Sequence, residues 1–166
     1  TDPYACNGAI SHINDWLLLR TIFKDGRLIA YDAMFGHMTD VGGKVPGSLP
    51  TDAREIFEEG IRVPPLKIFK NDELQSDVLN LILHNSRMPT WNRSDFNALV
   101  AAMRTAEKRV IEMAERFGDD EYYSALDELL ARNKRAMARL IKDTVPTKKQ
   151  HFEDYICDDG LGMGPY

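Results

Sequence analysis

The sequence predicts an α+β fold, because a segment rich in glycine and proline precedes a longer segment with helical periodicity. Residues 1–65 contain 7 of the 11 glycines and 5 of the 8 prolines, whereas residues 72–142 contain one of each. Glycine and proline interrupt regular elements, so loops and strands are expected first and helices second. With 166 residues, the chain is long enough to bury the core of one domain.

A β-hairpin is predicted near the N-terminus. Residues 17–23 and 27–34 are short runs with apolar and β-branched side chains, and a Lys-Asp-Gly sequence lies between them. A glycine-containing turn between two such runs is typical of a hairpin. Residues 36–50 are punctuated by glycine and proline and should form no regular element. Thr51 is then expected to cap a short helix that ends at Gly60.

Three helices are predicted from apolar residues that recur every three or four positions. They cover about residues 71–85, capped by Asn71 or Asp72, then about 94–117 and 119–142. Acidic side chains open the last helix and basic ones gather near its end, which suits the helix dipole. Because only Gly118 separates the two long helices, they should form an antiparallel helical hairpin.

These elements divide the chain into three segments of one partial domain. Residues 1–65 form a segment of loops and strands that carries the candidate metal site, and residues 66–146 form a helical segment. Residues 147–166 are expected to begin the next β segment, since Tyr155-Ile156 resembles the start of a strand. The first residue is not methionine and the start resembles the middle of a loop, so we expect an internal piece of a longer polypeptide.

Composition excludes several classes of protein. The formal net charge is -5, so no basic surface is expected to attract nucleic acid or an anionic membrane. The longest strongly apolar run, residues 16–19, is far too short to cross a bilayer. Two cysteines do not make a disulfide framework, and a reducing cytoplasm suits them best.

Two histidines in the glycine-rich segment are each followed by an aspartate three positions later. His12 precedes Asp15, and His37 precedes Asp40. Two imidazoles and one carboxylate suit a divalent metal with open positions for substrate. Asp40 could be a fourth ligand or could orient an imidazole. From spacing alone, a capped turn or a surface pair is the commoner explanation of such a sequence, so both interpretations stay open.

The other reactive positions are weaker candidates. His84 and His151 are expected at the surface, and Cys6 is better explained as a passive buried thiol than as a nucleophile. The glycine-rich loop at residues 42–48 lacks the Gly-Lys-Ser/Thr ending of a phosphate-binding loop. No Gly-x-Ser-x-Gly sequence is present to supply a hydrolase serine.

Several motifs in one order resemble the hydantoinase B family. They are Asp2-Pro3-Tyr4, Gly8, Ser11-His12-x-x-Asp15-Trp16, His37-x-x-Asp40-x-Gly42-Gly43-x-x-Pro46-Gly47-Ser48, Glu59-Gly60-Ile61-x-Val63-Pro64-Pro65, Asn85-x-Arg87-x-Pro89 with Asp95, and Arg116-Phe117-Gly118. The family includes the B component of N-methylhydantoinase, part of 5-oxoprolinase, and the alpha subunits of acetone and acetophenone carboxylases. The resemblance covers nearly the whole chain and is strongest over residues 1–65.

Within this family, residues 5–12 and 35–40 look most like the acetone carboxylase alpha subunit. Met38 departs from the His-His pair of hydantoinase-type members. The resemblance implies that His12, Asp15 and His37 are metal ligands and catalytic residues. It implies manganese as the metal, with zinc as the other option.

The function implied is that of a catalytic, metal-binding subunit fragment of an ATP-dependent ketone carboxylase. Such an enzyme forms a β-keto acid such as acetoacetate from a ketone and bicarbonate. A hydantoinase A-type partner subunit would bind ATP, and a small third subunit is a further expected partner. The alternative enzyme is an ATP-dependent N-methylhydantoinase B or 5-oxoprolinase-type cyclic amide hydrolase. The alternative from another class is a non-catalytic interaction scaffold of such a complex.

Overall fold

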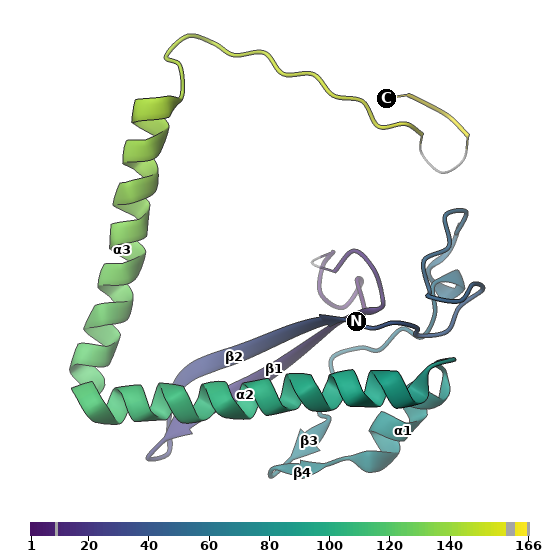
Figure 1. Ribbon diagram of the computed structural model, residues 1–166, viewed down its shortest axis with the longest axis horizontal. Coiled ribbons are helices and arrows are strands. Elements are labelled where there is room, and N and C mark those ends of the chain that lie inside the picture. The colour runs from purple at the N-terminus through teal and green to yellow at the C-terminus, as the bar shows by residue number, and fades with distance from the viewer. Residues whose placement is uncertain (9, 159–161, 166) are drawn as a thin grey trace. The chain divides into compact units, whose positions relative to one another are not determined.

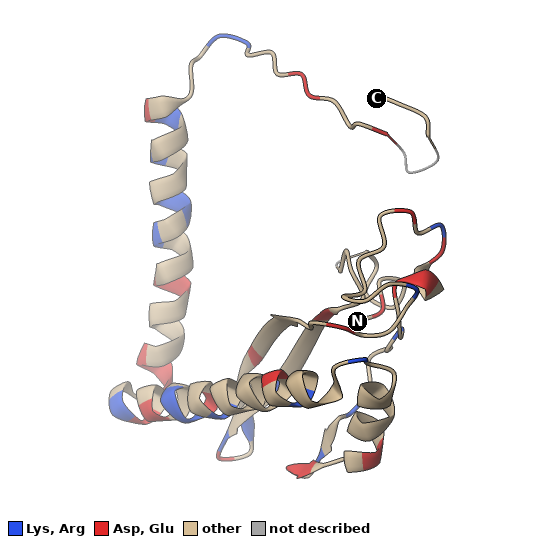
Figure 2. Ribbon diagram, turned by 45° about the vertical axis from the view of Figure 1, so that its right-hand side comes forward, with Lys and Arg blue, Asp and Glu red and all other residues tan. Residues whose placement is uncertain are grey.

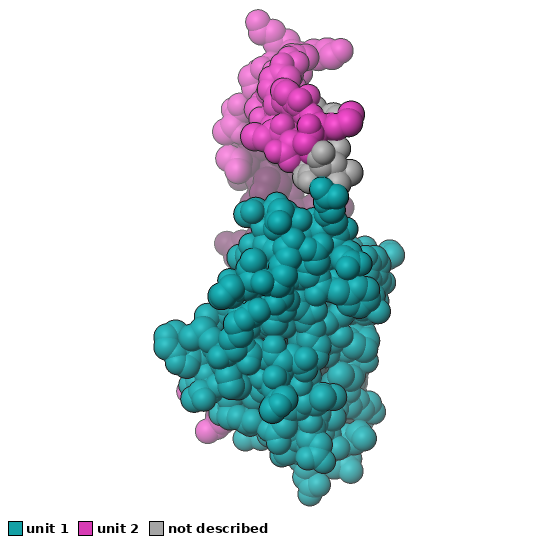
Figure 3. All heavy atoms as spheres, turned by 90° about the vertical axis from the view of Figure 1, so that its right-hand side faces the viewer, with its two compact units in different colours: residues 1–107 teal, residues 108–166 magenta. Residues whose placement is uncertain are grey.

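The computed structural model describes residues 1–8, 10–158 and 162–165, drawn in Figure 1. The chain divides into two compact units, Thr1–Glu107 and Lys108–Tyr166, coloured separately in Figure 3. The long helix α2 passes from the first unit into the second. The segment boundaries expected after residues 65 and 146 therefore stay predictions.

The predicted β-hairpin is confirmed and is longer than expected. Strands β1 (Asp15–Lys24) and β2 (Arg27–His37) pair antiparallel around a two-residue turn. The turn residues Asp25 and Gly26 have φ of 51° and 75°. Two consecutive positive φ angles suit the right-handed twist of a tight hairpin, and an Asp-Gly sequence adopts them easily.

A β-bulge sets the register of this hairpin. Phe23 lies opposite Leu28, but Ile22 lies opposite Ala30, so Ile29 is an additional residue in β2. The bulge shifts every later pair by one position, and at the far end Asp15 lies opposite His37. A hairpin of this length without the bulge would place Gly36 there instead.

The inner face of the hairpin packs on α2 in the first unit, as Figure 1 shows. Arg20 forms an ion pair with Glu107 at 2.7 Å between its guanidinium nitrogen and the carboxylate oxygen. The backbone of Gly36 lies so near Leu99 that an added Cβ would be 2.9 Å from the Leu99 Cδ1 atom. Glycine at this position therefore allows the strand to approach the helix closely.

The segment after the hairpin is irregular, as expected up to residue 50, but the helix predicted between Thr51 and Gly60 is wrong. Only a single 3₁₀ turn, η1 (Ile56–Glu58), forms there. The Glu58 carboxylate accepts hydrogen bonds from the Arg54 and Glu55 N–H groups, so the turn begins late. Gly60, with φ of 139°, leaves the helical region immediately afterwards.

The caps predicted at Asn71 and Asp72 are also wrong. These residues form the turn of a second, very short hairpin between β3 (Phe69–Lys70) and β4 (Glu73–Leu74), with φ of 50° and 62°. Asparagine and aspartate tolerate the left-handed region, so two in succession favour a turn over a helix start. The helix α1 (Ser76–His84) begins only after this hairpin.

Both long helices are confirmed as elements. α2 (Pro89–Phe117) begins earlier than the predicted start near residue 94, because proline is well suited to a first helical turn. α3 (Asp119–Thr144) follows Gly118, with acidic residues in its first turn and Lys142 in its last (Figure 2). The antiparallel packing of the two helices stays a prediction.

Most of the apolar stripe of α3 is exposed, although Tyr122 near its start is buried. Exposed fractions run from 40% at Leu126 to 71% at Leu130, and Leu140 is 54% exposed. Beyond α3, the described residues 145–158 and 162–165 form no helix or strand, and residues 159–161 and 166 lie outside the described part. That residues 147–166 begin a β segment thus stays a prediction.

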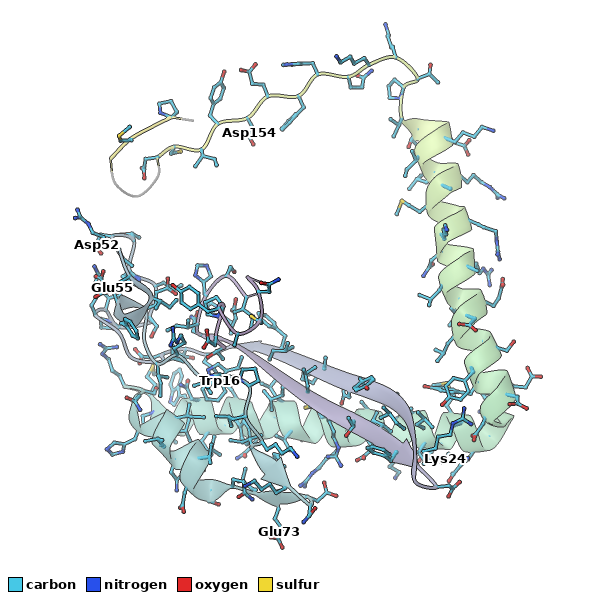
Figure 4. The ribbon with its side chains drawn as sticks, turned by 180° about the vertical axis from the view of Figure 1, so that it is seen from behind. Trp16, Lys24, Asp52, Glu55, Glu73 and Asp154 are labelled. Atoms are coloured by element: carbon cyan, nitrogen blue, oxygen red, sulfur yellow. The ribbon has the colours of Figure 1, made fainter. Side chains whose placement is uncertain are left out.

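The hydrophobic core lies where the open end of the hairpin meets α1 and the start of α2. Figure 4 shows Trp16 at this end of the hairpin and Lys24 at the opposite tip. The core residues are Ile13, Trp16, Met38, Val41, Leu79, Ile82, Leu83 and Phe96. The predicted ligands at positions 12, 15 and 37 are thus adjacent in sequence to core residues, which fix their backbone. Among the described helices, none is both long and apolar enough to cross a membrane.

Candidate metal centre

The structure brings two of the three predicted ligands into direct contact. Asp15 begins β1 and His37 ends β2, directly opposite each other. The Asp15 Oδ1 atom lies 2.6 Å from the His37 Nδ1 atom. Asp15 is buried, whereas the His37 side chain is 47% exposed, so a carboxylate lies behind an imidazole that solvent can reach.

Asn14 is a third member of this cluster. Its Nδ2 atom lies 2.8 Å from the His37 Nε2 atom and donates a hydrogen bond to the Met38 carbonyl at 3.3 Å. Asn14 is fully buried. This residue could not be identified from the sequence, because a single asparagine within a His-x-x-Asp sequence carries no spacing signal of its own.

His12 lies on the turn that leads into β1. Its carbonyl accepts a hydrogen bond from the Asp15 N–H at 3.1 Å, and its side chain is exposed. Within the described part of the chain, no three His, Cys, Asp or Glu side chains are arranged as a metal-binding group. Asp15 and His37 are in contact, but the complete ligand set of His12, Asp15 and His37 stays a prediction.

Asp40 is buried, and its carboxylate is engaged by its own loop. Oδ1 accepts hydrogen bonds from the N–H groups of Gly42 and Arg87, each at 3.0 Å. Oδ2 accepts from the Gly47 N–H and from the Arg87 guanidinium, also at 3.0 Å. Burial raises the pKa of Asp40, but these donors outweigh it and hold the pKa below its ordinary value. This geometry favours the supporting role for Asp40 over direct ligation.

Arg87 also stabilises the backbone of this loop. Its guanidinium also donates to the carbonyls of Gly42, Gly43 and Val45, at 3.1, 2.5 and 3.2 Å. The Asn92 amide donates to the Asp40 carbonyl at 2.5 Å. The segment that immediately follows His37 is therefore fixed by residues from between α1 and α2 and from α2 itself.

The weaker candidates lie at or near the surface, and Cys6 is less buried than expected. His84 and His151 are exposed. Cys6 is half-buried, and its Sγ atom donates to the Asp2 carbonyl at 3.0 Å. Neither Cys6 nor Cys157 forms a disulfide.

The donor chemistry of the cluster fits a divalent metal ion. Imidazole nitrogen and carboxylate oxygen are ligands of zinc and manganese. Here the imidazole is open to solvent, and the buried carboxylate lies directly behind it. His12 on the adjoining turn is a second imidazole within the same short segment. The residues that would hold the ion are therefore His37, Asp15 and His12.

Comparison with known proteins places the chain in a family. The family model described as Hydantoinase B/oxoprolinase matches residues 1–164. The caprolactamase subunit beta of Pseudomonas jessenii is 35% identical over 154 residues, which are 93% of this chain and 26% of that protein. The crystal structure of ATP-dependent caprolactamase from Pseudomonas jessenii matches with a TM-score of 0.78 and 35% identity, over 86% of this chain and 24% of that one.

The acetophenone carboxylase delta subunit of Aromatoleum aromaticum is 29% identical over 154 residues, which are 92% of this chain and 22% of that protein. The expected preference for the carboxylase branch is therefore not supported, since the caprolactamase subunit is the more similar of the two. The chain spans about a quarter of the length of these relatives. Because the family model covers nearly the whole sequence, the chain belongs to the hydantoinase B/oxoprolinase family.

Proposed function

We propose that this chain is part of the metal-binding subunit of an ATP-dependent cyclic amide hydrolase. The observation that carries the proposal is its similarity to a caprolactamase subunit, 35% identical in sequence and with a TM-score of 0.78 in structure. The Asp15–His37 pair supports it, because it brings two metal-ligating groups into contact and the His37 side chain is open to solvent.

The residues of the site have distinct tasks in this proposal. His12, Asp15 and His37 hold a divalent cation, manganese by the family resemblance and zinc as the other option. When bound, the cation would polarise the substrate carbonyl or lower the pKa of a water molecule. Asp15 supplies the negative charge and contacts the His37 ring, and Asp40 fixes the loop that follows His37.

ATP would be bound by a partner subunit of the hydantoinase A type. Two features support this division: the sequence has no phosphate-binding loop, and both named relatives are described as subunits. Activation by phosphorylation would then occur away from the Asp15–His37 cluster. A third, small subunit belongs to the carboxylase version of the proposal.

The second candidate function is ATP-dependent carboxylation of a ketone with bicarbonate. The relation to an acetophenone carboxylase subunit favours it, as does Met38 in place of a second histidine after His37. The same metal ligands would serve, with an enolate oxygen in place of an amide carbonyl. The substrate offered and the product formed separate the two candidates.

The test uses the full-length subunit assembled with its partners. The complex is given ATP with a lactam, hydantoin or 5-oxoproline, or ATP with a ketone and bicarbonate. We expect a ring-opened amino acid from the first set. A β-keto acid from the second set alone would replace the hydrolase proposal with the carboxylase.

Ligand variants of the same complex test the site. We expect His12→Ala, His37→Ala and Asp15→Asn each to remove bound metal and product formation together, measured by elemental analysis and product assay. His84→Ala is the control, because His84 is exposed at the end of α1 and should have no effect. Loss of metal in the His84 variant with retention in the His12 variant would contradict the assignment.

A further inference from the structure

The contacts of Asn14 define how its amide group is oriented. One end of the amide lies 3.3 Å from the Met38 carbonyl oxygen, which only accepts hydrogen bonds. That end must therefore be the NH₂ group, because an amide oxygen there would face another oxygen. The backbone keeps this arrangement in place, since the Met38 N–H donates to the Asn14 carbonyl at 2.7 Å.

The orientation of the amide in turn defines the proton on His37. The same NH₂ group lies 2.8 Å from His37 Nε2, so Nε2 must accept with its lone pair. A neutral imidazole has one acceptor and one N–H, so the proton is on Nδ1. That N–H points to Asp15 Oδ1 at 2.6 Å. Every polar atom of the ring therefore has a protein partner, although the side chain is 47% exposed.

We propose that Asn14 is a positioning residue that holds the His37 ring in the Nδ1–H tautomer and covers its Nε2 lone pair. A fully buried asparagine costs free energy unless its bonds are used, and the Oδ1 atom of Asn14 has no hydrogen-bond partner among the described residues. The contact between its NH₂ group and His37 Nε2 explains why a buried asparagine is present despite this cost in free energy. The inference deepens the proposed function, on which it rests because His37 is one of the proposed ligands.

The test measures how fast each histidine reacts with diethyl pyrocarbonate, which acylates an imidazole nitrogen through a free lone pair. The assembled, metal-free complex is treated at pH 8, where ordinary histidines are neutral, and modified peptides are quantified by mass spectrometry. His84 and His151 are exposed and provide the reference rates within the same sample. We expect His37 to react about tenfold more slowly, because both of its nitrogens are hydrogen-bonded.

Asn14→Ala removes the donor, and the His37 rate should then rise about five- to tenfold toward that of His84. Asn92→Ala is the matched control. Asn92 is equally buried, its NH₂ group also donates to a carbonyl, and its Oδ1 atom likewise lacks a partner, but it contacts Asp40 rather than His37. This control should leave the His37 rate unchanged, so a general loosening of the fold is separated from loss of the His37 contact.

Metal binding provides a second measurement. In a Mn²⁺ titration of the same complexes, Asn14→Ala should bind the ion at least as tightly as the unmodified protein, because the Asn14 NH₂ group occupies the Nε2 lone pair that a metal ion would use.

The inference is overturned if His37 of the unmodified protein reacts as fast as His84, a comparison that requires no variant to fold. It is equally overturned if Asn14→Ala leaves the His37 rate unchanged or if Asn92→Ala raises it as much. The reagent test uses neither metal nor substrate. Protection of His37 in a complex that opens no cyclic amide would therefore contradict the proposed function and leave the role of Asn14 standing.

Discussion

Asp40 is the residue on which the loop after His37 depends most directly. Its carboxylate accepts four hydrogen bonds, two at each oxygen, and its side chain is 2% exposed. A buried carboxylate is stable only when its oxygens are satisfied in this way. Asp40 therefore contributes to the site by holding the backbone of its neighbours.

We expect Asp40→Asn to destabilise this loop by about 2–4 kcal/mol, because an amide NH₂ group would face the N–H donors of Arg87 and Gly47. Metal affinity and activity should fall about 10- to 100-fold. Hydrogen–deuterium exchange of residues 40–48, followed by mass spectrometry, measures the loosening. Asp52→Asn is the control: Asp52 pairs with Lys44, is 80% exposed, and should change the exchange little. Equal effects of the two substitutions would contradict this role of Asp40.

The depressed pKa of Asp40 predicts the pH at which this support is lost. Because the pKa is lower in the folded protein than in the unfolded chain, ionised Asp40 stabilises the fold fully above the unfolded value near 4. The stabilisation disappears as the pH falls through the folded value. The difference in loop protection between the unmodified protein and Asp40→Asn should stay constant above about pH 5 and shrink below about pH 4. A difference that first shrinks near neutral pH would contradict it.

Elements show more clearly than residues what sequence can predict. The first hairpin, the irregular segment at 36–50 and the long helices were predictable, because their turn residues and apolar spacing act locally. The absence of a helix at residues 51–60 was not predictable, since it depends on which N–H groups donate to the Glu58 carboxylate. The Asn71-Asp72 turn was missed because the same residues favour helix caps and left-handed turns.

Only some of the contacts around the candidate site can be related to the sequence. The ligand set of His12, Asp15 and His37 stays a prediction that rests on the family resemblance, because spacing alone left a capped turn or a surface pair open. The contact between Asp15 and His37 depends on a register that the bulge at Ile29 sets. The roles of Asn14 and Arg87 were not predictable, because they arise only from contacts made in the folded chain. Arg87, for example, lies 47 positions from the Asp40 carboxylate that it contacts.

The close packing of the glycine loop on η1 can be tested with two alanine substitutions. Gly43 and Gly47 have similar φ of 77° and 82°, so alanine is strained at either position. A Cβ at Gly43 would also collide with the backbone of Glu58 and Glu59, whereas at Gly47 the nearest atom is 4.0 Å away. We expect Gly47→Ala to cost about 1 kcal/mol and Gly43→Ala at least 2 kcal/mol more. Thermal melting of the two variants measures the difference, and equal melting temperatures would exclude the collision.

At the scale of the whole molecule, the proposed division of labour separates nucleotide turnover from product formation. His12→Ala and His37→Ala affect only the metal centre, so the assembled variants should still hydrolyse ATP when substrate is present. They should form no product. Phosphate release and product are measured side by side, with His84→Ala as the control that keeps both. Loss of ATP turnover together with the metal, in a complex that still assembles, would indicate a single metal-dependent nucleotide site instead.

The exposed apolar faces predict how the 166-residue chain behaves when expressed alone. The stripe on α3 and the outer face of the hairpin expose large apolar side chains, and Leu19 is 69% and Tyr31 is 72% exposed. Contiguous apolar surface of this kind favours association. We expect self-association, measured by size-exclusion chromatography with light scattering. Leu130→Glu combined with Leu140→Glu should reduce it, because charges would then lie on the α3 stripe. A monomer with a sharp, cooperative melt would contradict the prediction.

The bulge at Ile29 makes the chemistry of the cluster depend on the length of the hairpin as well as on its residues. A natural variant that lost one residue near the turn could straighten the bulge and keep Asp15 opposite His37. A variant that gained one residue in β2, with turn and bulge kept, would place Gly36 opposite Asp15. The His37 imidazole would then no longer face the Asp15 carboxylate. Insertions and deletions in this hairpin should therefore be tolerated unequally over evolutionary time: single deletions should survive, and single insertions should be removed by selection.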